Sequence, residues 1–315
     1  MHRSGAESHV PAAGGGPHAQ PEAGVQRHCG RNRRLYRHHQ PGEPVLKLWQ
    51  RWLRAGVQPP GQKGEPGVRS YSVFAQYYDE LTSNVEYPKR AEYLLELMER
   101  LGHAPGLTLD LACGTGSLTL ELYKRGVDIY GIDGSVEMLS EARTKCAEAG
   151  ADILFLCQNM LSIDLYGTVD TALCTLDSLN HLKNGEELQR VFEKVSFFMN
   201  PGGYFLFDMN TLYKHQVVLG NETYVYDMDH VYCVWQNRCH AGGKVDIQLD
   251  FFEPEGGLYA RSTERFSERA YPVEEVLERL SKAGFGEVQV FDELTFNPPR
   301  EDSQRLVFAA KKRER

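Results

Sequence analysis

The sequence predicts an α/β fold in which a mainly parallel sheet carries an antiparallel β insertion. Residues 107–133 read as a strand, a glycine-rich turn, a helix and a second strand ending in Asp133, which is one βαβ unit. Further apolar runs of strand length follow at 151–157, 168–176 and 204–209. From 223 to 266 the pattern changes to alternating, aromatic-rich runs split by two Gly-Gly pairs, which is typical of antiparallel hairpins.

Charge is distributed unevenly along the 315-residue chain. Residues 1–70 hold eleven Lys/Arg against four Asp/Glu, and because the whole chain carries −8, residues 71–315 carry −15. A body this acidic disfavours non-specific nucleic-acid binding, although it leaves room for a local basic groove. The composition, 41% hydrophobic and 25% charged, is ordinary for a soluble globular protein.

Residues 1–70 differ in amino-acid composition from the rest of the chain. They contain eleven Gly, eight Pro and six His with few aliphatic residues, so they bury too little surface to offset the entropy of ordering. We expect either a disordered extension or a misassigned start, with natural translation beginning near Val68. Residues 71–315 are expected to form one domain, with the β insertion at about 214–268.

The seven cysteines are scattered without a CxxC pair, and several lie in apolar runs. This pattern predicts a reducing, cytoplasmic location, since a buried free thiol packs as a small hydrophobe. Cys233, Cys239 and His240 raise the question of zinc, but no fourth ligand stands at suitable spacing, so we expect no metal. No apolar run is long enough to span a membrane, and the sequence shows no signal-peptide core.

Two helical segments are expected before the first strand. Residues 71–81 are aromatic and part-helical. Residues 87–101 place apolar side chains at helical spacing, until Gly102 and Pro105 end the pattern. The aromatic side chains of the first segment either line a ligand site or dock the segment onto the core.

The glycine turn at 113–116 suits a nucleoside ligand. Glycines let the backbone approach a ligand closely, and the start of the following helix presents free N–H groups. Asp133, at the tip of the second strand, can accept both hydroxyl groups of a ribose. A dinucleotide site would need a small third residue in GxGxxG/A, and that position holds the bulkier Thr119.

The series Asp110-x-Ala112-x-Gly114-x-Gly116 resembles the first motif of class I S-adenosylmethionine (SAM) methyltransferases. The resemblance covers 71–315 and implies a Rossmann-like sheet of seven strands, the last of them antiparallel, with the antiparallel β insertion acting as a lid. In detail the chain resembles a small bacterial branch of uncharacterised methyltransferases. That closer likeness rests on Phe74-Ala75, Tyr78-Asp79, 109–116, Asp177-Ser178-Leu179-Asn180 and Glu268-Arg269-Ala270-Tyr271.

The resemblance also implies which residues bind SAM and its product, S-adenosylhomocysteine. Asp110 is expected near the methionine end of the cofactor, and Asn159 at the adenine amino group. The family usually has glycine at 112 and aspartate at 159; alanine keeps the small size and asparagine keeps an acceptor oxygen. The expected cofactor residues are Tyr78, Asp110, Ala112, Cys113, Gly114, Gly116, Asp133, Gly134, Met138, Asn159, Met160 and Asp177.

Polar residues gather at the expected ends of the fourth and fifth strands, where open α/β sheets bind ligands. His181, Asp177 and Asp208 are candidate bases for taking a proton from the acceptor. The alternative is structural, with Asp177 capping the turn and His181 packing beside the cofactor. The candidate substrate contacts are Asn180, Asn210 and, in the β insertion, Trp235.

The resemblance predicts an enzyme that transfers a methyl group from SAM to a nitrogen or oxygen atom of a small molecule by in-line displacement. The insertion would exclude water and give specificity, and the acidic body favours a neutral or cationic acceptor. Two alternatives stay open: a methyltransferase acting on tRNA or rRNA, and a non-catalytic SAM-binding regulator. The Asn-Pro-Pro-Tyr-type tetrapeptide of enzymes that methylate exocyclic base amines is absent at 176–179. The expected assembly is a monomer or homodimer without membrane association.

Overall fold

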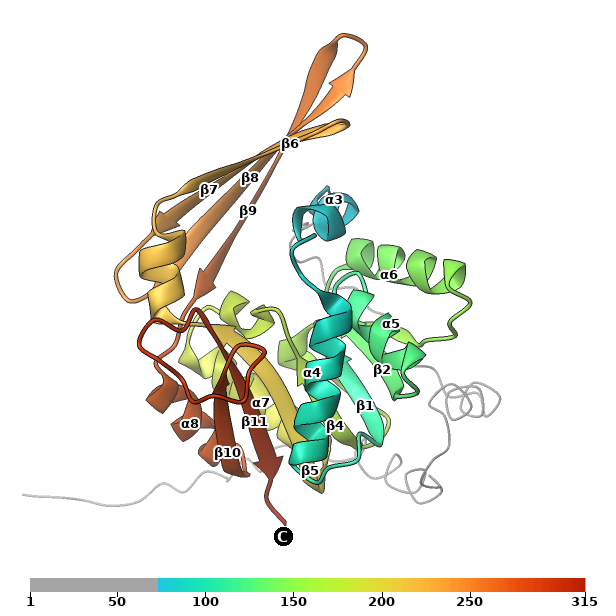
Figure 1. Ribbon diagram of the computed structural model, residues 1–315, viewed down its shortest axis with the longest axis vertical. Coiled ribbons are helices and arrows are strands. Elements are labelled where there is room, and N and C mark those ends of the chain that lie inside the picture. The colour runs from blue at the N-terminus through green and yellow to red at the C-terminus, as the bar shows by residue number, and fades with distance from the viewer. Residues whose placement is uncertain (1–72, 315) are drawn as a thin grey trace, which may run out of the picture. The chain divides into compact units, whose positions relative to one another are not determined.

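The computed structural model describes residues 73–314, so the predictions made for 1–70 lie outside the described residues. Within the described range the chain forms a seven-stranded sheet covered by helices on both faces, and a separate four-stranded sheet (Figure 1). No helix in this range is both long enough and apolar enough to cross a membrane.

The strand order across the large sheet is β10-β11-β5-β4-β1-β2-β3. Strands β1 to β5 pair in parallel with one another, whereas β11 is antiparallel to both β5 and β10. The bounds are β1 (Leu107–Leu111), β2 (Asp128–Asp133), β3 (Phe155–Cys157), β4 (Val169–Cys174), β5 (Met199–Asn210), β10 (Phe285–Asp292) and β11 (Arg305–Lys312). The predicted α/β sheet of seven strands ending in an antiparallel strand is therefore confirmed.

Two strands differ from their predicted bounds for local reasons. β3 is shorter than 151–157 because it lies at the edge of the sheet and pairs with β2 only from Gly131 to Asp133. β5 is longer than 204–209 because residues 199–203 also belong to it, through a bulge where the register with β4 shifts between Val169 and Thr171.

Five helices cover the large sheet in two layers, with α4, α5 and α6 on one face and α7 and α8 on the other (Figure 1). Their apolar faces make the core: Leu97 of α4 and Leu122 of α5 are buried in one cluster, and Phe192 of α7 and Leu280 of α8 in the other. The bounds are α4 (Tyr87–Arg100), α5 (Ser117–Lys124), α6 (Val136–Glu148), α7 (Gly185–Phe197) and α8 (Val273–Lys282).

The small sheet is a meander in the order β6-β7-β8-β9, antiparallel throughout. Its strands are β6 (Thr223–Met228), β7 (Val231–Cys239), β8 (Lys244–Glu255) and β9 (Leu258–Arg269). Both Gly-Gly pairs have positive φ in the turns, which confirms the predicted hairpins. A π-helical turn, η4 (Lys214–Leu219), leads into this sheet and was not predicted.

The helix α3 (Phe74–Leu81) packs on the small sheet. The ring of Phe74 lies 6.1 Å from that of Phe266 and 6.4 Å from that of Phe251. Glu264 of β9 accepts hydrogen bonds from the backbone N–H groups of Val73 and Phe74, both at 2.8 Å. The start of α3 is therefore tied to the insertion, as one of the two interpretations of this aromatic segment expected.

Candidate active site

The turn between β1 and α5 is built on positive φ angles. Ala112 has φ 60°, Gly114 53° and Gly116 70°. A Cβ at Gly116 would lie 2.9 Å from the Cβ of Ala142, so glycine is also required for α5 to pack against α6. Ala112 carries a side chain in a conformation that only glycine adopts without strain.

Asp133 fixes this turn from the tip of β2. Its Oδ2 accepts from the N–H of Gly114 at 2.9 Å, and its Oδ1 from the N–H of Ser135 at 2.8 Å. Burial raises the pKa of Asp133, and these N–H donors oppose the shift. The carboxylate thus has a defined position at the strand tip, where a ribose acceptor was predicted.

A hollow lies beside the turn and reaches the end of β4. It is lined by Tyr78, Tyr87, Asp110, Ala112, Cys113, Gly114, Thr115, Ser117, Leu118, Thr175, Leu176 and Ser178. The structure therefore brings Tyr78, from the segment before the sheet, together with four predicted cofactor residues of β1 and the turn.

Asp110 is a buried carboxyl group on the wall of this hollow, with only 2% of its surface exposed. Thr119 Oγ1 donates a hydrogen bond of 2.5 Å to its Oδ2. Burial raises the pKa of Asp110 to about 7, the charge of Asp133 adds to the shift, and the bond from Thr119 opposes it. Thr119, whose size argued against a dinucleotide site, thus uses its hydroxyl group to bind the acid of the motif, Asp110.

A second network joins α3 to the turn. Asp79 Oδ1 accepts from Thr115 Oγ1 at 2.7 Å and from Ser117 Oγ at 3.1 Å. Lys145 of α6 forms an ion pair with the other oxygen of Asp79 and donates to Thr115 O at 3.1 Å. The helix that packs on the small sheet is therefore bonded to the glycine turn as well.

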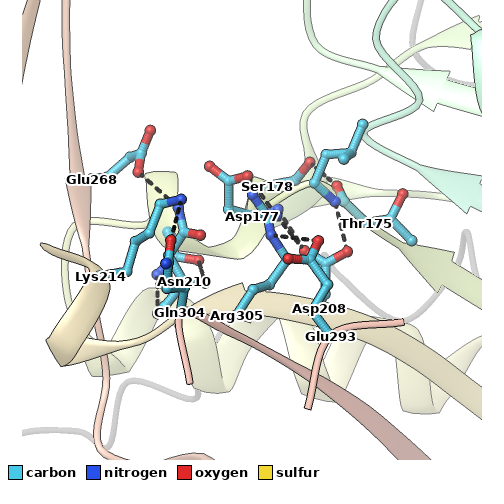
Figure 2. A network of polar contacts seen from close by, with 12 residues as sticks. Thr175, Asp177, Ser178, Asp208, Asn210, Lys214, Glu268, Glu293, Gln304 and Arg305 are labelled. Carbon is cyan, nitrogen blue, oxygen red and sulfur yellow. Dashed lines mark hydrogen bonds and ion pairs between the residues drawn. The ribbon is translucent and has the colours of Figure 1, made fainter. Parts of the chain in front are cut away.

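The turn that follows β4 is strained, because Leu176 and Asp177 have φ 57° and 53°. Asp208 of β5 holds it: its carboxylate accepts from the N–H groups of Leu176 and Asp177 at 2.9 and 2.8 Å. Arg305 Nη1 lies 2.7 Å from Asp208 Oδ1 and 2.7 Å from Asp177 Oδ1 (Figure 2).

This geometry favours a structural role for Asp208, whose predicted role as a base stays a prediction. The side chain of Asp208 is only 2% exposed. Each of its oxygens pairs with a different arginine: Arg90 Nη1 lies 3.2 Å from Oδ2, and Arg305 Nη1 contacts Oδ1. Burial alone would raise the pKa of Asp208, but the two guanidinium groups outweigh it and hold the pKa below its usual range. Asp208 is a positioning residue for the strained turn.

Asp177, His181 and Glu268 converge beside this turn, each with a nitrogen or oxygen atom within 4.8 Å of the others. His181 Nε2 is 4.0 Å from Glu268 Oε1. Burial raises the pKa of Asp177 and Glu268 adds to the shift, although Arg305 opposes it. Burial also acts to raise the pKa of Glu268, but His215, His181 and Arg305 outweigh it, so this pKa is lowered. Apart from its place in the run 268–271, Glu268 had no feature in the sequence that indicated a function.

Comparison with known proteins decides the family. The sequence profile of a family described as a methyltransferase domain matches residues 108–203. YqeM of Bacillus subtilis (strain 168), which is classed as a methyltransferase, is 34% identical over 244 residues, covering 77% of this chain and 97% of YqeM. This chain belongs to the class I SAM-dependent methyltransferases.

Solved structures agree with this assignment. A SAM-dependent methyltransferase from Clostridium acetobutylicum ATCC 824 is 31% identical, with a TM-score of 0.70 over 78% of this chain and 99% of that one. KedS8, a sugar N-methyltransferase from Streptoalloteichus sp. ATCC 53650, shares the fold at 21% identity, with a TM-score of 0.63 over 82% of this chain and 98% of its own.

The residues of the methyltransferase fit SAM, whose sulfonium group supplies a methyl group activated for transfer. Asp133 is held at the strand tip by the turn itself, and Asp110 offers a buried carboxyl group to a cationic ligand. The φ of Ala112 explains why the family usually has glycine there.

The adenine end of the predicted site lies on the next elements of the methyltransferase. Ser135 caps α6 by accepting from the N–H of Met138 at 3.1 Å, and Met138 is buried. Asn159 Oδ1 accepts from the N–H of Leu161 at 2.9 Å and so caps the short helix η2 (Met160–Ser162). Gly134 has open space around its Cα, with no atom within 4 Å of an added Cβ. The cofactor roles of these residues stay predictions.

The three predicted substrate contacts lie in different surroundings. Asn180 lies on the short helix η3 (Ser178–His181), is fully buried, and donates from Nδ2 to the carbonyls of Asn210 and Arg269 at 3.1 and 2.9 Å. These bonds tie β5 to β9, and the contact of Asn180 with the acceptor stays a prediction. Asn210 lies 3.5 Å from Glu268 through Nδ2, so it stands at the cluster. Trp235 donates from Nε1 to Asn237 at 2.7 Å within the small sheet.

Proposed function

We propose that this methyltransferase methylates a nitrogen or oxygen atom of a small, neutral or cationic molecule, at the end of β4 and beneath the small sheet. The observation that carries the proposal is the convergence of Asp177, His181 and Glu268 next to residues that line the hollow. Carboxylate and imidazole groups can orient a polar acceptor and take its proton.

The lining of the hollow supports a small acceptor rather than RNA. None of its residues, all in the described part of the chain, is lysine or arginine. Recognition of single-stranded RNA uses basic and aromatic surfaces, and residues 71–315 carry −15. KedS8, which shares the fold, is a sugar N-methyltransferase, so the architecture accommodates a small amine acceptor.

In this mechanism the chain does three things. The strained turn at 176–177 and the small sheet place the acceptor in line with the activated methyl group and exclude water. His181 or Asp177 takes the proton that the acceptor loses. Of the two aspartates at the strand tips, Asp177 suits this role because its pKa is raised, whereas that of Asp208 is lowered.

The test is a screen for production of S-adenosylhomocysteine with the full chain, SAM, and separate pools of amines, amino sugars, hydroxylated compounds, tRNA and rRNA. We expect turnover with one small-molecule pool. Turnover with RNA alone would overturn the proposal. Once an acceptor is found, Asp177→Asn should change the pH profile of kcat, whereas Asp208→Asn should lower stability and leave the shape of that profile intact.

A further inference from the structure

We propose that Asp177, His181 and Glu268 form a binding site for one divalent metal ion. Their three donor atoms lie within 4.8 Å of one another, and His181 Nε2 is 4.0 Å from Glu268 Oε1. Ligands at bond lengths of about 2.0–2.3 Å from one ion lie roughly 3 to 4.5 Å apart, depending on the angle between them. The atoms therefore need only small movements to bind one ion.

His215 points independently to a cation at this place. Its side chain is fully buried, and Nδ1 lies 2.7 Å from the carbonyl oxygen of Gly243. Because a carbonyl can only accept, Nδ1 carries a proton, and in the neutral ring Nε2 then holds a lone pair. Metal-binding histidines are commonly oriented in this way, with the second ring nitrogen donating to a backbone carbonyl.

That Nε2 atom faces a carboxylate. It lies 3.4 Å from Glu268 Oε2 and makes no hydrogen bond within the described residues. Nearby Asn210 Oδ1 is another buried acceptor without a hydrogen bond in the described part of the chain. Electron-rich atoms facing one another out of water are unfavourable unless a cation joins them. His215 thus presents a buried nitrogen without a hydrogen bond among the described residues, beside the second oxygen of Glu268 at the edge of the three-residue cluster.

The charge balance at the turn favours a cation too. The carboxylates there are Asp177, Asp208, Glu268 and Glu293, and Lys214 and Arg305 lie among them (Figure 2). Arg90, which pairs with Asp208 and Glu293, is the third cationic side chain. One negative charge is left over before any histidine is counted. Arg305 binds Oδ1 of Asp177 at 2.7 Å, so Oδ2 is the oxygen assigned to the ion.

One imidazole with two carboxylates suits a divalent ion such as Mn²⁺ or Zn²⁺. The site lies beside Leu176 and Ser178 of the hollow, so the ion would hold the acceptor through an oxygen or nitrogen donor and favour its deprotonation. With the ion bound, His181 and Asp177 would act as its ligands, and the ion would replace them in activating the acceptor. This use of the ion rests on the proposed function, whereas the binding site itself does not.

The experiment measures metal binding alone, without SAM or acceptor. Full-length protein is treated with EDTA, dialysed, and titrated with Mn²⁺ while the electron paramagnetic resonance signal of free Mn²⁺ is followed; calorimetry with Zn²⁺ and Mg²⁺ provides comparison. We expect one Mn²⁺ per chain, and at least a ~10- to 100-fold weaker affinity in His181→Ala and in Glu268→Gln.

His240→Ala is the matched control, because His240 also pairs with a carboxylate, Asp246 at 2.7 Å, but stands outside the cluster. Its Mn²⁺ affinity should equal that of the wild type. His181 is partly exposed, so its truncation should keep the fold, and an unchanged midpoint of urea unfolding in His181→Ala would confirm this. Absence of stoichiometric uptake, or equal uptake by wild type and both cluster variants, overturns the metal site and indicates that a proton joins His215 to Glu268. A failed acceptor screen would leave this result unaffected.

Discussion

Asp110→Asn removes the one buried carboxyl group on the hollow whose pKa lies near neutrality. In the wild type, burial and the charge of Asp133 raise that pKa to about 7. If the ionised form binds the cationic cofactor, SAM affinity follows the ionised fraction. For a pKa of about 7 this fraction rises about tenfold from pH 6 to pH 8, so the affinity should rise about tenfold, or ~1.4 kcal/mol.

The assay is calorimetric titration with SAM at pH 6, 7 and 8, in buffers that differ in ionisation enthalpy so that proton release is counted. The α-amino group of SAM contributes equally to wild type and Asp110→Asn, so the difference between their slopes isolates Asp110. Thr119→Val, which removes the hydrogen bond to Asp110, should move the transition to higher pH. Equal slopes in wild type and Asp110→Asn would refute the argument.

The same substitution, Asp110→Asn, should also change the stability of the fold, and here it is expected to be favourable at high pH. A carboxyl group whose folded pKa is raised stabilises the fold fully below its unfolded pKa, and this contribution is lost as pH rises through about 7. Asp110→Asn should therefore be more stable than wild type at pH 8, by up to on the order of 4 kcal/mol, with the difference shrinking towards pH 4. Urea denaturation at the two pH values measures it, and a less stable variant at pH 8 would contradict the burial argument.

Three further substitutions test the turns. Ala112→Gly relieves a side chain at φ 60° and should raise the free energy of unfolding by ~1 kcal/mol in urea denaturation; a loss of that size would show that the position is unstrained. Arg305→Ala leaves Asp177 and Asp208 without their shared guanidinium and should cost ~3–5 kcal/mol of stability, so an effect below 1 kcal/mol would contradict the buried ion pairs. Asp133→Ala should weaken SAM binding by about 1.5–3 kcal/mol in calorimetry, and unchanged affinity would place the ribose elsewhere.

The fold could be predicted from the sequence because its signals are local. The strand, glycine turn, helix and acid of the first βαβ unit lie within 107–133, and the hairpins follow from alternation and Gly-Gly pairs. The errors concern strand bounds that depend on pairing between strands distant in the sequence. The length of β3 depends on how much of β2 it pairs with, and the bulge in β5 depends on its register with β4.

The candidate site was predictable only in part for the same reason. Asp110 and Asp133 belong to the local motif, so their place was evident. The contrast between Asp177 and Asp208 depends on Arg305, which comes from the last strand and has no motif to mark it. Likewise Glu268 meets both His181 and His215 only because β9 packs against η3, far from it in the sequence. Nothing in the spacing of these residues along the chain indicates such a cluster.

The two attachments of α3 bear on how the cofactor site opens. Its first residues are bonded to Glu264 in the insertion, and Asp79 near its end is bonded to the glycine turn. An eight-residue helix tied at both ends cannot swing away from the cofactor turn without pulling on β9. We therefore expect the small sheet and the glycine turn to move together, so that the cofactor site opens for exchange only when the small sheet is displaced.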